Sequence, residues 1–392
     1  MRKSPLLPIF LIVSVDVLGL TIILPLLPFY AVSFGASATQ VGSLVSTYAF
    51  FQLIAGPILG RMSDHSGRKP LLIVSQIGTF IGFLILAGAQ SLWMVFLSRI
   101  IDGATAGNLS LAQAYIADVT EPEDRAKSFA VIGIAFGIGF LIGPGISGFL
   151  AQYGYVYPIL TAAGLSFLSI LCTTFLLPNP APHLNAGSGP GGKRLGIFDW
   201  GNYVEYFRRP GLGRLLFQFL CFAFSFSMFI SGFALYAKGR YTWNGSPYGP
   251  REVGYILAYA GFLGIILQGG LMGRLVKWLG ERKLVWTGFF ASTVSYTMLG
   301  WTRTFGQLLA ANTIGSYGSG VARPAITALV THKADRSEQG VVLGLTQSLN
   351  SISQIVAPIA AGALIDRGWL AAWACATGAA AFIGFLISIG AE

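Results

Sequence analysis

Long runs of apolar residues, separated by short polar segments, make up most of the chain. Each run reaches about 20 residues, the length that an α-helix needs to cross roughly 30 Å of hydrocarbon. The pattern predicts an all-α, multi-pass membrane protein with twelve transmembrane helices. We place them at residues 5–33, 40–60, 70–88, 92–118, 127–151, 156–177, 213–237, 252–276, 283–302, 306–331, 339–365 and 369–390.

The second half of the chain echoes the first. Residues 60–70 return in altered form at 273–283, a shift of 213 positions. Two further pairs agree with that shift: Asp124-Arg125 with Asp335-Arg336, and Gly143-Pro144-x-x-Ser147-Gly148 with Ala357-Pro358-x-x-Ala361-Gly362. Repeats of this kind are typical of transporters. We therefore expect two pseudo-symmetric six-helix bundles, at residues 1–177 and 213–392.

A cytoplasmic linker at residues 178–212 is expected between the bundles, because it is the longest polar segment and is rich in Pro and Gly. Its second part, 197–209, interleaves aromatic and charged residues. That pattern fits a short helix on the inner membrane surface or, equally, an ordered loop.

Composition supports the membrane assignment, since 54% of residues are hydrophobic and only 10% are charged. The net charge of +10 does not indicate a nucleic-acid partner, because the basic residues lie in alternate loops rather than on one face. Eighteen of the 25 Lys and Arg residues fall on the side that holds both termini. By the positive-inside rule both termini are expected in the cytoplasm.

The N-terminal run is interpreted as the first span, because it is too long for a signal peptide and carries Asp16. The three cysteines all lie within expected spans and the three histidines outside them. We expect no disulfide framework, no metal site and no cofactor, with a proton gradient as the energy source.

Charged residues inside a span are costly and are therefore candidates for function. Asp16 has no opposite charge in its own span, and burial would favour its neutral, protonated form, so it is the leading proton carrier. Arg99 and Asp102 are three residues apart and can pair on one helix face. Arg323 is left with two interpretations: it binds an anionic group of a substrate, or it pairs with an acid or a helix C-terminus at the inner gate.

Uncharged polar and aromatic residues within the spans predict a central substrate cavity, although many such groups simply bond neighbouring helices. The candidates, with Arg323, are Gln52, Asn108, Gln113, Phe226, Tyr255, Tyr259, Gln268, Asn312, Gln347 and Asn350.

Residues 60–70 resemble the loop between spans 2 and 3 of the major facilitator superfamily. The matching residues are Gly60, Asp64, Gly67, Arg68 and Lys69, whereas His65 stands where the family often has Arg. The resemblance implies a cytoplasmic latch that holds one conformation, with Asp118 at the inner end of span 4 assigned to the same group.

Span 5 resembles the antiporter motif of that family through Gly139, Gly143, Pro144 and Gly148, with Ser147 in place of a glycine. This implies an antiporter-like gate, where the glycines permit tight packing at the interface between the halves. Arg99 matches the family's span-4 arginine linked to proton coupling, and Asp16-x-x-Gly19 is similar to its span-1 pattern.

Over nearly its whole length the chain resembles the twelve-span drug:proton antiporters, and within them the tetracycline-efflux proteins. It departs from these at Gly82, Gly264 and Ser292, where the pumps carry acidic residues or a histidine. We therefore do not expect tetracycline itself to be the substrate.

The expected function is proton-coupled export of small lipophilic or amphipathic compounds by alternating access, by a monomer among the lipids of a bacterial inner membrane. The alternative is a uniporter, or a lipid or metabolite transporter of the same fold, without proton coupling. A receptor or assembly factor is disfavoured because no substantial soluble domain is evident. An enzyme is disfavoured because no nucleophile–base pair, metal cluster or phosphate-binding loop is evident.

Overall fold

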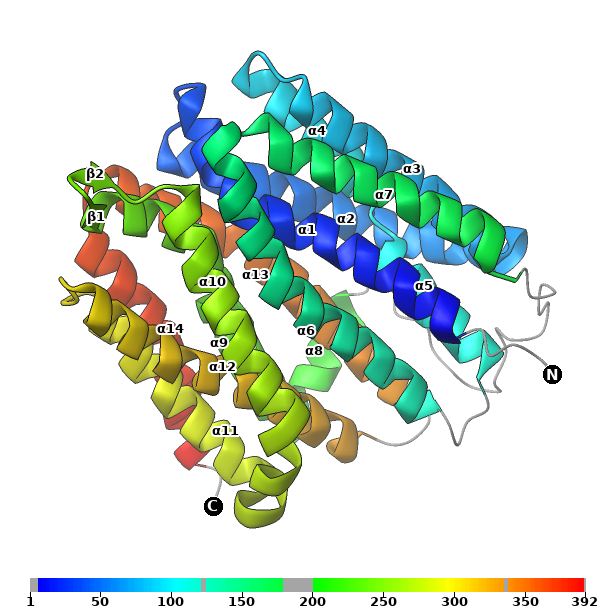
Figure 1. The fold of residues 1–392 in the computed structure, drawn as a ribbon. Helices are drawn as coiled ribbons and strands as arrows, with labels where there is room; N and C mark the ends of the chain where they lie inside the picture. The colour runs from blue at the N-terminus through cyan, green and yellow to red at the C-terminus, as the bar shows by residue number, and fades with distance from the viewer. Residues whose placement is uncertain (1–5, 121–124, 179–199, 335–337, 391–392) are drawn as a thin grey trace. The chain divides into compact units, whose positions relative to one another are not determined.

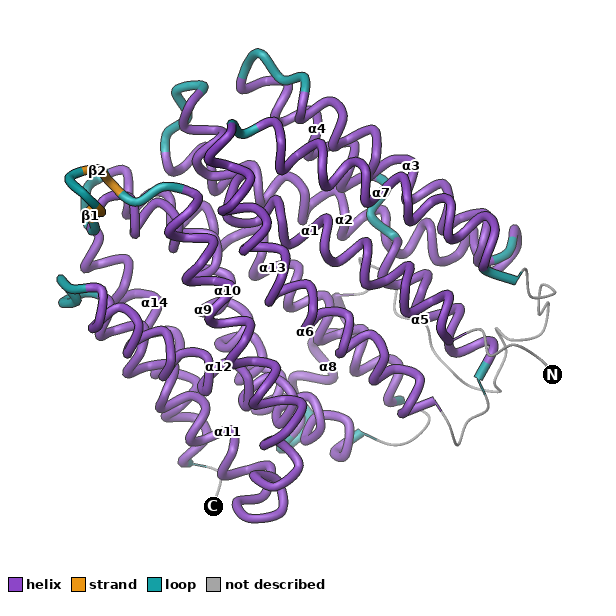
Figure 2. The backbone as a smooth tube through the Cα atoms, viewed as in Figure 1, coloured by secondary structure: helices purple, strands orange, loops and turns teal. Residues whose placement is uncertain are grey.

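The computed structural model describes residues 6–120, 125–178, 200–334 and 338–390, and nearly all of these residues are helical (Figure 1, Figure 2). The all-α prediction is therefore confirmed. The helices are α1 (Leu6–Ser33), α2 (Ala38–Ser66), α3 (Arg68–Ala87), α4 (Leu92–Ala104), α5 (Asn108–Val119), α6 (Arg125–Leu150), η1 (Ala151–Tyr153), α7 (Val156–Leu176), α8 (Trp200–Arg208), α9 (Leu212–Arg240), α10 (Pro250–Ile266), η2 (Leu267–Leu271), α11 (Met272–Leu299), α12 (Phe305–Lys333), α13 (Gln339–Asp366) and α14 (Leu370–Ile389).

Strands are confined, in the described chain, to a two-residue antiparallel hairpin of β1 (Thr242–Trp243) and β2 (Ser246–Pro247). The turn between them places Asn244 and Gly245 at φ values of 50° and 81°. Two successive positive φ angles are typical of the tight turns that join such strands. The hairpin links the end of α9 to the start of α10.

Two of the expected span boundaries differ from the structure. The expected helix at 92–118 is divided into α4 and α5 at residues 105–107, where the amide of Gly107 donates to Ser75 Oγ at 2.9 Å instead of continuing a helix. The spans expected at 252–276 and 283–302 share one run of helix, Pro250–Leu299, of 50 residues. That run departs from helical geometry at Gly280, whose φ is 73°. Only glycine adopts such a φ readily, so the chain turns there.

The structure divides into two compact units. Unit 1 comprises residues 1–36, 47–187 and 249–261, and unit 2 comprises residues 37–46, 188–248 and 262–392. The start of α2 thus packs with unit 2, and the first part of α10 packs with unit 1. The simpler division at residues 177 and 213 stays a prediction of the sequence.

The same helix packing occurs once in each unit, as a duplication predicts. In unit 1, α1 packs against α6 and α7, while α3 packs against α4 and α7. In unit 2, α9 packs against α13 and α14, while α11 packs against α12 and α14. The helices of the second set start 204 to 214 residues after their counterparts. The Asp124-Arg125 and Asp335-Arg336 echo lies largely outside the described residues.

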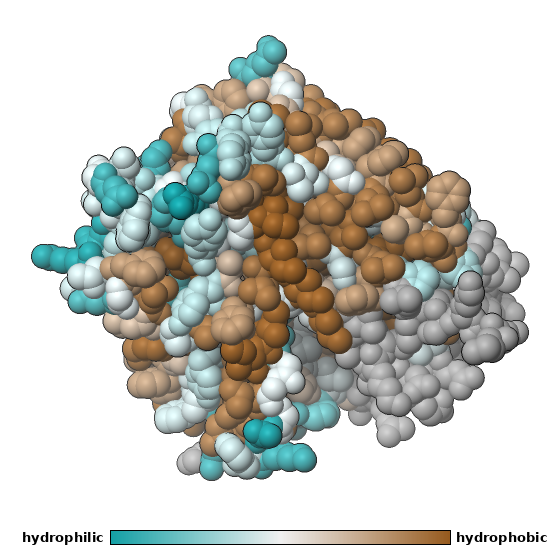
Figure 3. Space-filling view, viewed as in Figure 1, coloured by the Kyte–Doolittle hydropathy of each residue, from teal (hydrophilic) through white to brown (hydrophobic). Residues whose placement is uncertain are grey.

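Each unit has an apolar core of its own. Tyr115 and Ile116 of α5 are buried at the centre of the first, and Phe289 of α11 at the centre of the second. Large apolar side chains also face outward (Figure 3), among them Phe175 of α7, which is 78% exposed. Apolar surface on both the inside and the outside suits a protein surrounded by lipid. Among the described helices, nine are long and apolar enough to span a membrane.

Part of the expected linker is helical. Residues 179–199 lie outside the described chain, but α8 packs on unit 2 through Tyr206, which is buried in its core cluster. Arg209, directly after α8, pairs with Glu338 at 2.5 Å and with Glu205 at 3.2 Å. Of the two interpretations of residues 197–209, the structure favours a short helix, held here by protein contacts.

Candidate functional site

Asp16, the candidate proton carrier, meets neutral partners inside unit 1. Its partly buried carboxylate forms hydrogen bonds with Gln76 of α3 and Ser169 of α7. Gln76 Nε2 also donates to Ser169 Oγ at 2.8 Å, so three helices meet at this point. No ion pair to Asp16 is found in the described parts of the chain. A carboxylate without a counter-ion in a membrane span is more easily accommodated when it carries a proton.

Close packing of α1 on α6 sets the position of Asp16. Thr21 Oγ1 donates to the Gly139 carbonyl at 2.9 Å, and a Cβ on Gly139 would clash with Val17, the neighbour of Asp16. Gly143 lies equally close to Thr21. We expected these motif glycines at the interface between the halves; the structure places Gly139 and Gly143 against α1 of the same half instead. The physical reason is that only residues without a side chain admit the approach of α1.

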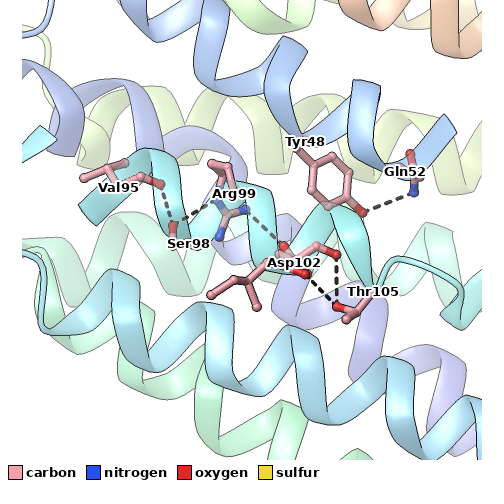
Figure 4. Close-up of polar contacts among 8 residues, drawn as sticks. Tyr48, Gln52, Val95, Ser98, Arg99, Asp102 and Thr105 are labelled. Carbon is pink, nitrogen blue, oxygen red and sulfur yellow. Dashed lines mark hydrogen bonds and ion pairs between the residues drawn. The ribbon is translucent and has the colours of Figure 1, made fainter. Parts of the chain in front are cut away.

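Arg99 and Asp102 form the expected pair on α4. Their side chains meet at 3.2 Å between Nη1 and Oδ2, and each residue is only 5% exposed (Figure 4). Thr79 of α3 also forms a hydrogen bond with Asp102. Tyr48 of α2 lies beside the pair and is hydrogen-bonded to Gln52 at 3.2 Å (Figure 4). Arg99 Nη2 has no partner in the described chain, so the pair neutralises the charge but leaves one buried donor free.

The two acidic positions are connected through α3. Gln76 contacts Asp16 and Thr79 contacts Asp102, and these two residues are three apart on one helix face. Asp16 and Asp102 are close enough to repel each other when both are ionised. Sequence reasoning missed Gln76, Thr79 and Ser169. The available signal was the spacing of Gln76 and Thr79, three residues apart in the largely apolar run 70–88.

The residues of the expected latch lie together at one end of unit 1. Arg68 pairs with Asp64 at 2.6 Å and with Asp118 at 2.8 Å, and it also donates to Ser63 Oγ at 2.6 Å. Its Nη1 approaches the Gly60 carbonyl at 3.5 Å. One guanidinium thus joins α2, α3 and α5. The role of this contact as a conformational latch stays a prediction.

The other two latch residues shape the turn itself. Gly67 has a φ of 92°, which only glycine adopts without strain, and it allows α3 to start directly after α2. Lys69 Nζ donates to the carbonyls of Thr174 and Leu177 at 2.8 and 2.7 Å, closing the C-terminal end of α7. A cation at that end of a helix is electrostatically favourable.

Two glycine-based helix crossings are related by the repeat. In unit 1, Gly254 of α10 lies against the Pro144 carbonyl, and a Cβ on Gly148 would come 2.9 Å from the Arg251 carbonyl. In unit 2, Gly42 of α2 lies in the same way against the Pro358 carbonyl. Gly42 and Gly254 are 212 residues apart, and the two prolines are 214 apart. The second crossing is further held by Asp366, whose carboxylate accepts from the amides of Ala38 and Thr39 at 2.6 and 2.9 Å.

The predicted cavity residues fall into two sets, one in each unit. Unit 1 contains Gln52, Asn108, Gln113, Tyr255 and Tyr259; unit 2 contains Phe226, Gln268, Asn312, Arg323, Gln347 and Asn350. Gln113, Tyr255, Gln268, Arg323 and Gln347 are exposed, Asn312 is buried, and the others are partly buried. That the two sets line one cavity stays a prediction.

Comparison with known proteins supports a transport function. The family model of the Major Facilitator Superfamily matches residues 9–358 and 269–391. The class C tetracycline resistance protein of Escherichia coli is 30% identical over 88% of this chain and 86% of its own length. Multidrug resistance protein 2 of Bacillus subtilis is 26% identical over 90% of this chain and 87% of its own. A solved nucleoside transporter has the same fold, with a TM-score of 0.81 over 99% of both chains at 14% identity.

Proposed function

This chain belongs to the major facilitator superfamily, and from that premise we propose that it exports small amphipathic compounds in exchange for protons that bind at Asp16. It is a transporter rather than an enzyme, and an integral, multi-pass inner-membrane protein. Its relatives are named for resistance to tetracycline and to several drugs, which supports export. They do not favour the uniporter or the lipid and metabolite transporter considered as alternatives.

The environment of Asp16 is the observation that carries the proton coupling. Its carboxylate is held by an amide and a hydroxyl, and Arg99, a cation of the neighbouring network, is already paired with Asp102. Binding a proton removes a charge that hydrocarbon disfavours by at least about 2.5 kcal/mol. Losing that proton is favourable only when water reaches the site. A conformational cycle that exposes Asp16 first to one side and then to the other would therefore couple proton movement to export.

The mechanism assigns separate tasks to neighbouring residues. Asp16 binds and releases the proton, while Gln76 and Ser169 orient its carboxylate. Gly139 and Gly143 let α6 lie against α1 beside this site, so a movement of α6 acts directly on the helix that carries Asp16. The Arg68 cluster holds α2, α3 and α5 together and would stabilise one of the alternating conformations.

The decisive test replaces Asp16 with Asn in the full-length protein, reconstituted in proteoliposomes. An imposed pH gradient should drive efflux of ethidium by the wild type, and Asp16→Asn should reduce that efflux to the level of empty liposomes, because asparagine cannot exchange a proton. Exchange of ethidium without a gradient should persist, since the scaffold is intact.

Glu205→Gln is the matched control, because Glu205 is an exposed carboxylate of α8 whose side chain retains 59% of its accessible surface. It should transport as the wild type does. Efflux that still follows the pH gradient in Asp16→Asn would remove Asp16 from its proposed role.

A further inference from the structure

One face of α12, the helix that covers the predicted span 306–331, is polar. Asn312, Ser316 and Arg323 recur at spacings of four and seven residues, which places them on one side of an α-helix. The other side of α12 packs tightly on α11: Gly318 lies against Ser292, and Ala322 against Gly288. The polar face is therefore turned away from α11.

Groups on this face lack the partners that buried polar atoms normally have. Asn312 is 6% exposed, and its Nδ2 has no hydrogen-bond partner in the described chain; the same holds for the buried Ser316 Oγ. Nearly all buried polar atoms in proteins find a partner, so two unsatisfied groups on one helix face need an explanation.

Arg323 is the charged member of the face and has no ion pair or side-chain hydrogen bond among the described residues. The described carboxylates of the second half are already engaged: Glu252 with the Gly249 amide, Glu281 with His332, Glu338 with Arg209, and Asp366 with Ala38 and Thr39. The ion pair that we considered for Arg323 therefore finds no acid here.

The depth of Arg323 makes an unpaired guanidinium unfavourable in lipid. It lies ten residues before the end of α12, about 15 Å along the helix axis. A cation at this depth is stable only where water or an anion reaches it. Its exposed surface thus points to an aqueous path or a ligand site, not to hydrocarbon.

The neighbouring elements fit a ligand site. The π-helical segment η2 packs on α12 through Leu267, which lies against Gly320, one turn before Arg323. Such segments are frequently found at functional sites. Gln268, the next residue of η2, is exposed. The helix α9 also packs on α12, and it carries the stacked rings of Phe222 and Phe226.

We propose that this face of α12 binds an anionic substrate, with Arg323 pairing with the charge and Ser316 and Asn312, about 10 and 16 Å away along the helix axis, donating hydrogen bonds to acceptors further along the same ligand. The ligand class is an organic anion with a planar apolar body and a carboxylate or sulfonate group, because a guanidinium binds such planar anions through two parallel hydrogen bonds. The inference rests on the proposed export function and adds organic anions to the amphipathic compounds that it would export.

The test compares three probes that share one ring system: naphthoate, its neutral amide naphthamide, and the cation naphthylmethylammonium. Their binding to full-length protein in lipid nanodiscs is measured by calorimetry. Naphthoate should bind the wild type at least about tenfold more tightly than naphthamide, as expected for a charge-assisted contact. The Arg323→Gln variant should abolish that preference while leaving naphthamide binding unchanged.

Two variants keep the test decisive. Arg323→Lys retains the charge without the planar fork and should reduce the preference without removing it. Arg303→Gln, at an exposed arginine just before α12, should have no effect. If Arg323→Gln does not fold, the probe preference of the wild type and its reduction in Arg323→Lys decide the question.

The inference is overturned if naphthoate binds the wild type no better than naphthamide, or if the preference survives in Arg323→Gln. Its failure can be told apart from failure of the export function. Proton-driven ethidium efflux without naphthoate recognition would reject the anion site alone. Naphthoate recognition without proton-driven efflux of any probe would reject the coupling at Asp16 and keep the site.

Discussion

Arg99 and Arg323 lie on helices related by the internal repeat, yet the two arginines differ in every aspect of their surroundings. Arg99 on α4 is 5% exposed and is paired with Asp102 on the same helix at 3.2 Å. Arg323 on α12 is exposed and has no partner among the described residues. No charged residue stands 212 to 214 positions after Arg99, where the sequence has Ala311, Asn312 and Thr313, so Arg323 is not the repeat counterpart of Arg99.

The two arginines illustrate two ways in which a membrane protein accommodates a charge: by an ion pair within the chain, or by a counter-ion from outside it. A buried arginine with its own carboxylate is neutral as a pair, and it costs less than the same arginine buried without its partner. An arginine without one requires a counter-ion from outside the chain. In the first unit the buried arginine is thus paired within the protein, which suits proton exchange at the neighbouring Asp16. In the second unit Arg323 remains available for a ligand.

The largest expected effect comes from breaking the internal pair. Asp102→Asn leaves the Arg99 guanidinium buried without a counter-charge, and loss of one partner of a buried pair typically costs about 3–5 kcal/mol. We expect a large fall in the melting temperature of the purified protein. Arg323→Gln should change it little, because no protein contact is lost.

The double variant Asp102→Asn with Arg99→Gln is the control, since it removes both charges and should recover much of the lost stability. Equal destabilisation by Asp102→Asn and Arg323→Gln would contradict the distinction between the two arginines.

A smaller effect is expected at the crossings where the two units do resemble each other. Gly42→Ala and Gly254→Ala should each destabilise the protein by about 1–3 kcal/mol, because the added methyl group meets the carbonyl of Pro358 or Pro144. Thermal unfolding in detergent measures both. Gly264→Ala on α10 is the control, since nothing lies within 4 Å of the added group. A crossing variant that is as stable as Gly264→Ala would show that its close approach can relax.

The smallest effect concerns the pair that holds α8 to unit 2. Hydrogen bonds from the Arg209 guanidinium lower the pKa of Glu338 below its usual 4.5. A carboxyl with a lowered pKa stabilises the fold above its unfolded pKa, and this stabilisation is lost as the pH falls through the lowered value. Proteolysis within α8 should therefore become faster below about pH 4. Glu338→Gln should show the faster cleavage already at neutral pH. Unchanged cleavage in this variant would show that the Arg209–Glu338 pair does not hold α8 on unit 2.

Local features of the chain allowed much of the fold to be predicted. The length of the apolar runs gave the spans, and the repeated motifs indicated the duplication that the paired packing of α1 with α6 and α9 with α13 displays. The Arg99–Asp102 pair followed from a spacing of three residues. Each of these features depends on residues that are close in sequence. It can therefore be predicted from a single segment of the chain.

The contacts between residues far apart in the sequence could not be predicted in this way. Gln76 and Ser169 reach Asp16 from helices about 60 and 150 positions away, and their own segments do not show that Asp16 is their partner. The motif glycines were recognised, but Gly139 was assigned to the wrong neighbour. Which helix a small residue admits depends on how all helices of a unit rotate and cross.

The amino-acid sequence by itself determined that this protein is a helical membrane transporter, because hydrocarbon requires long apolar helices and tolerates few charges. Only the tertiary structure decided how the other intramembrane charges are placed: neutral groups hold Asp16, and Arg323 stays without a partner in the described chain. The reason is that solvation and pairing act over a few ångströms in space, and helix packing alone sets which side chains come that close.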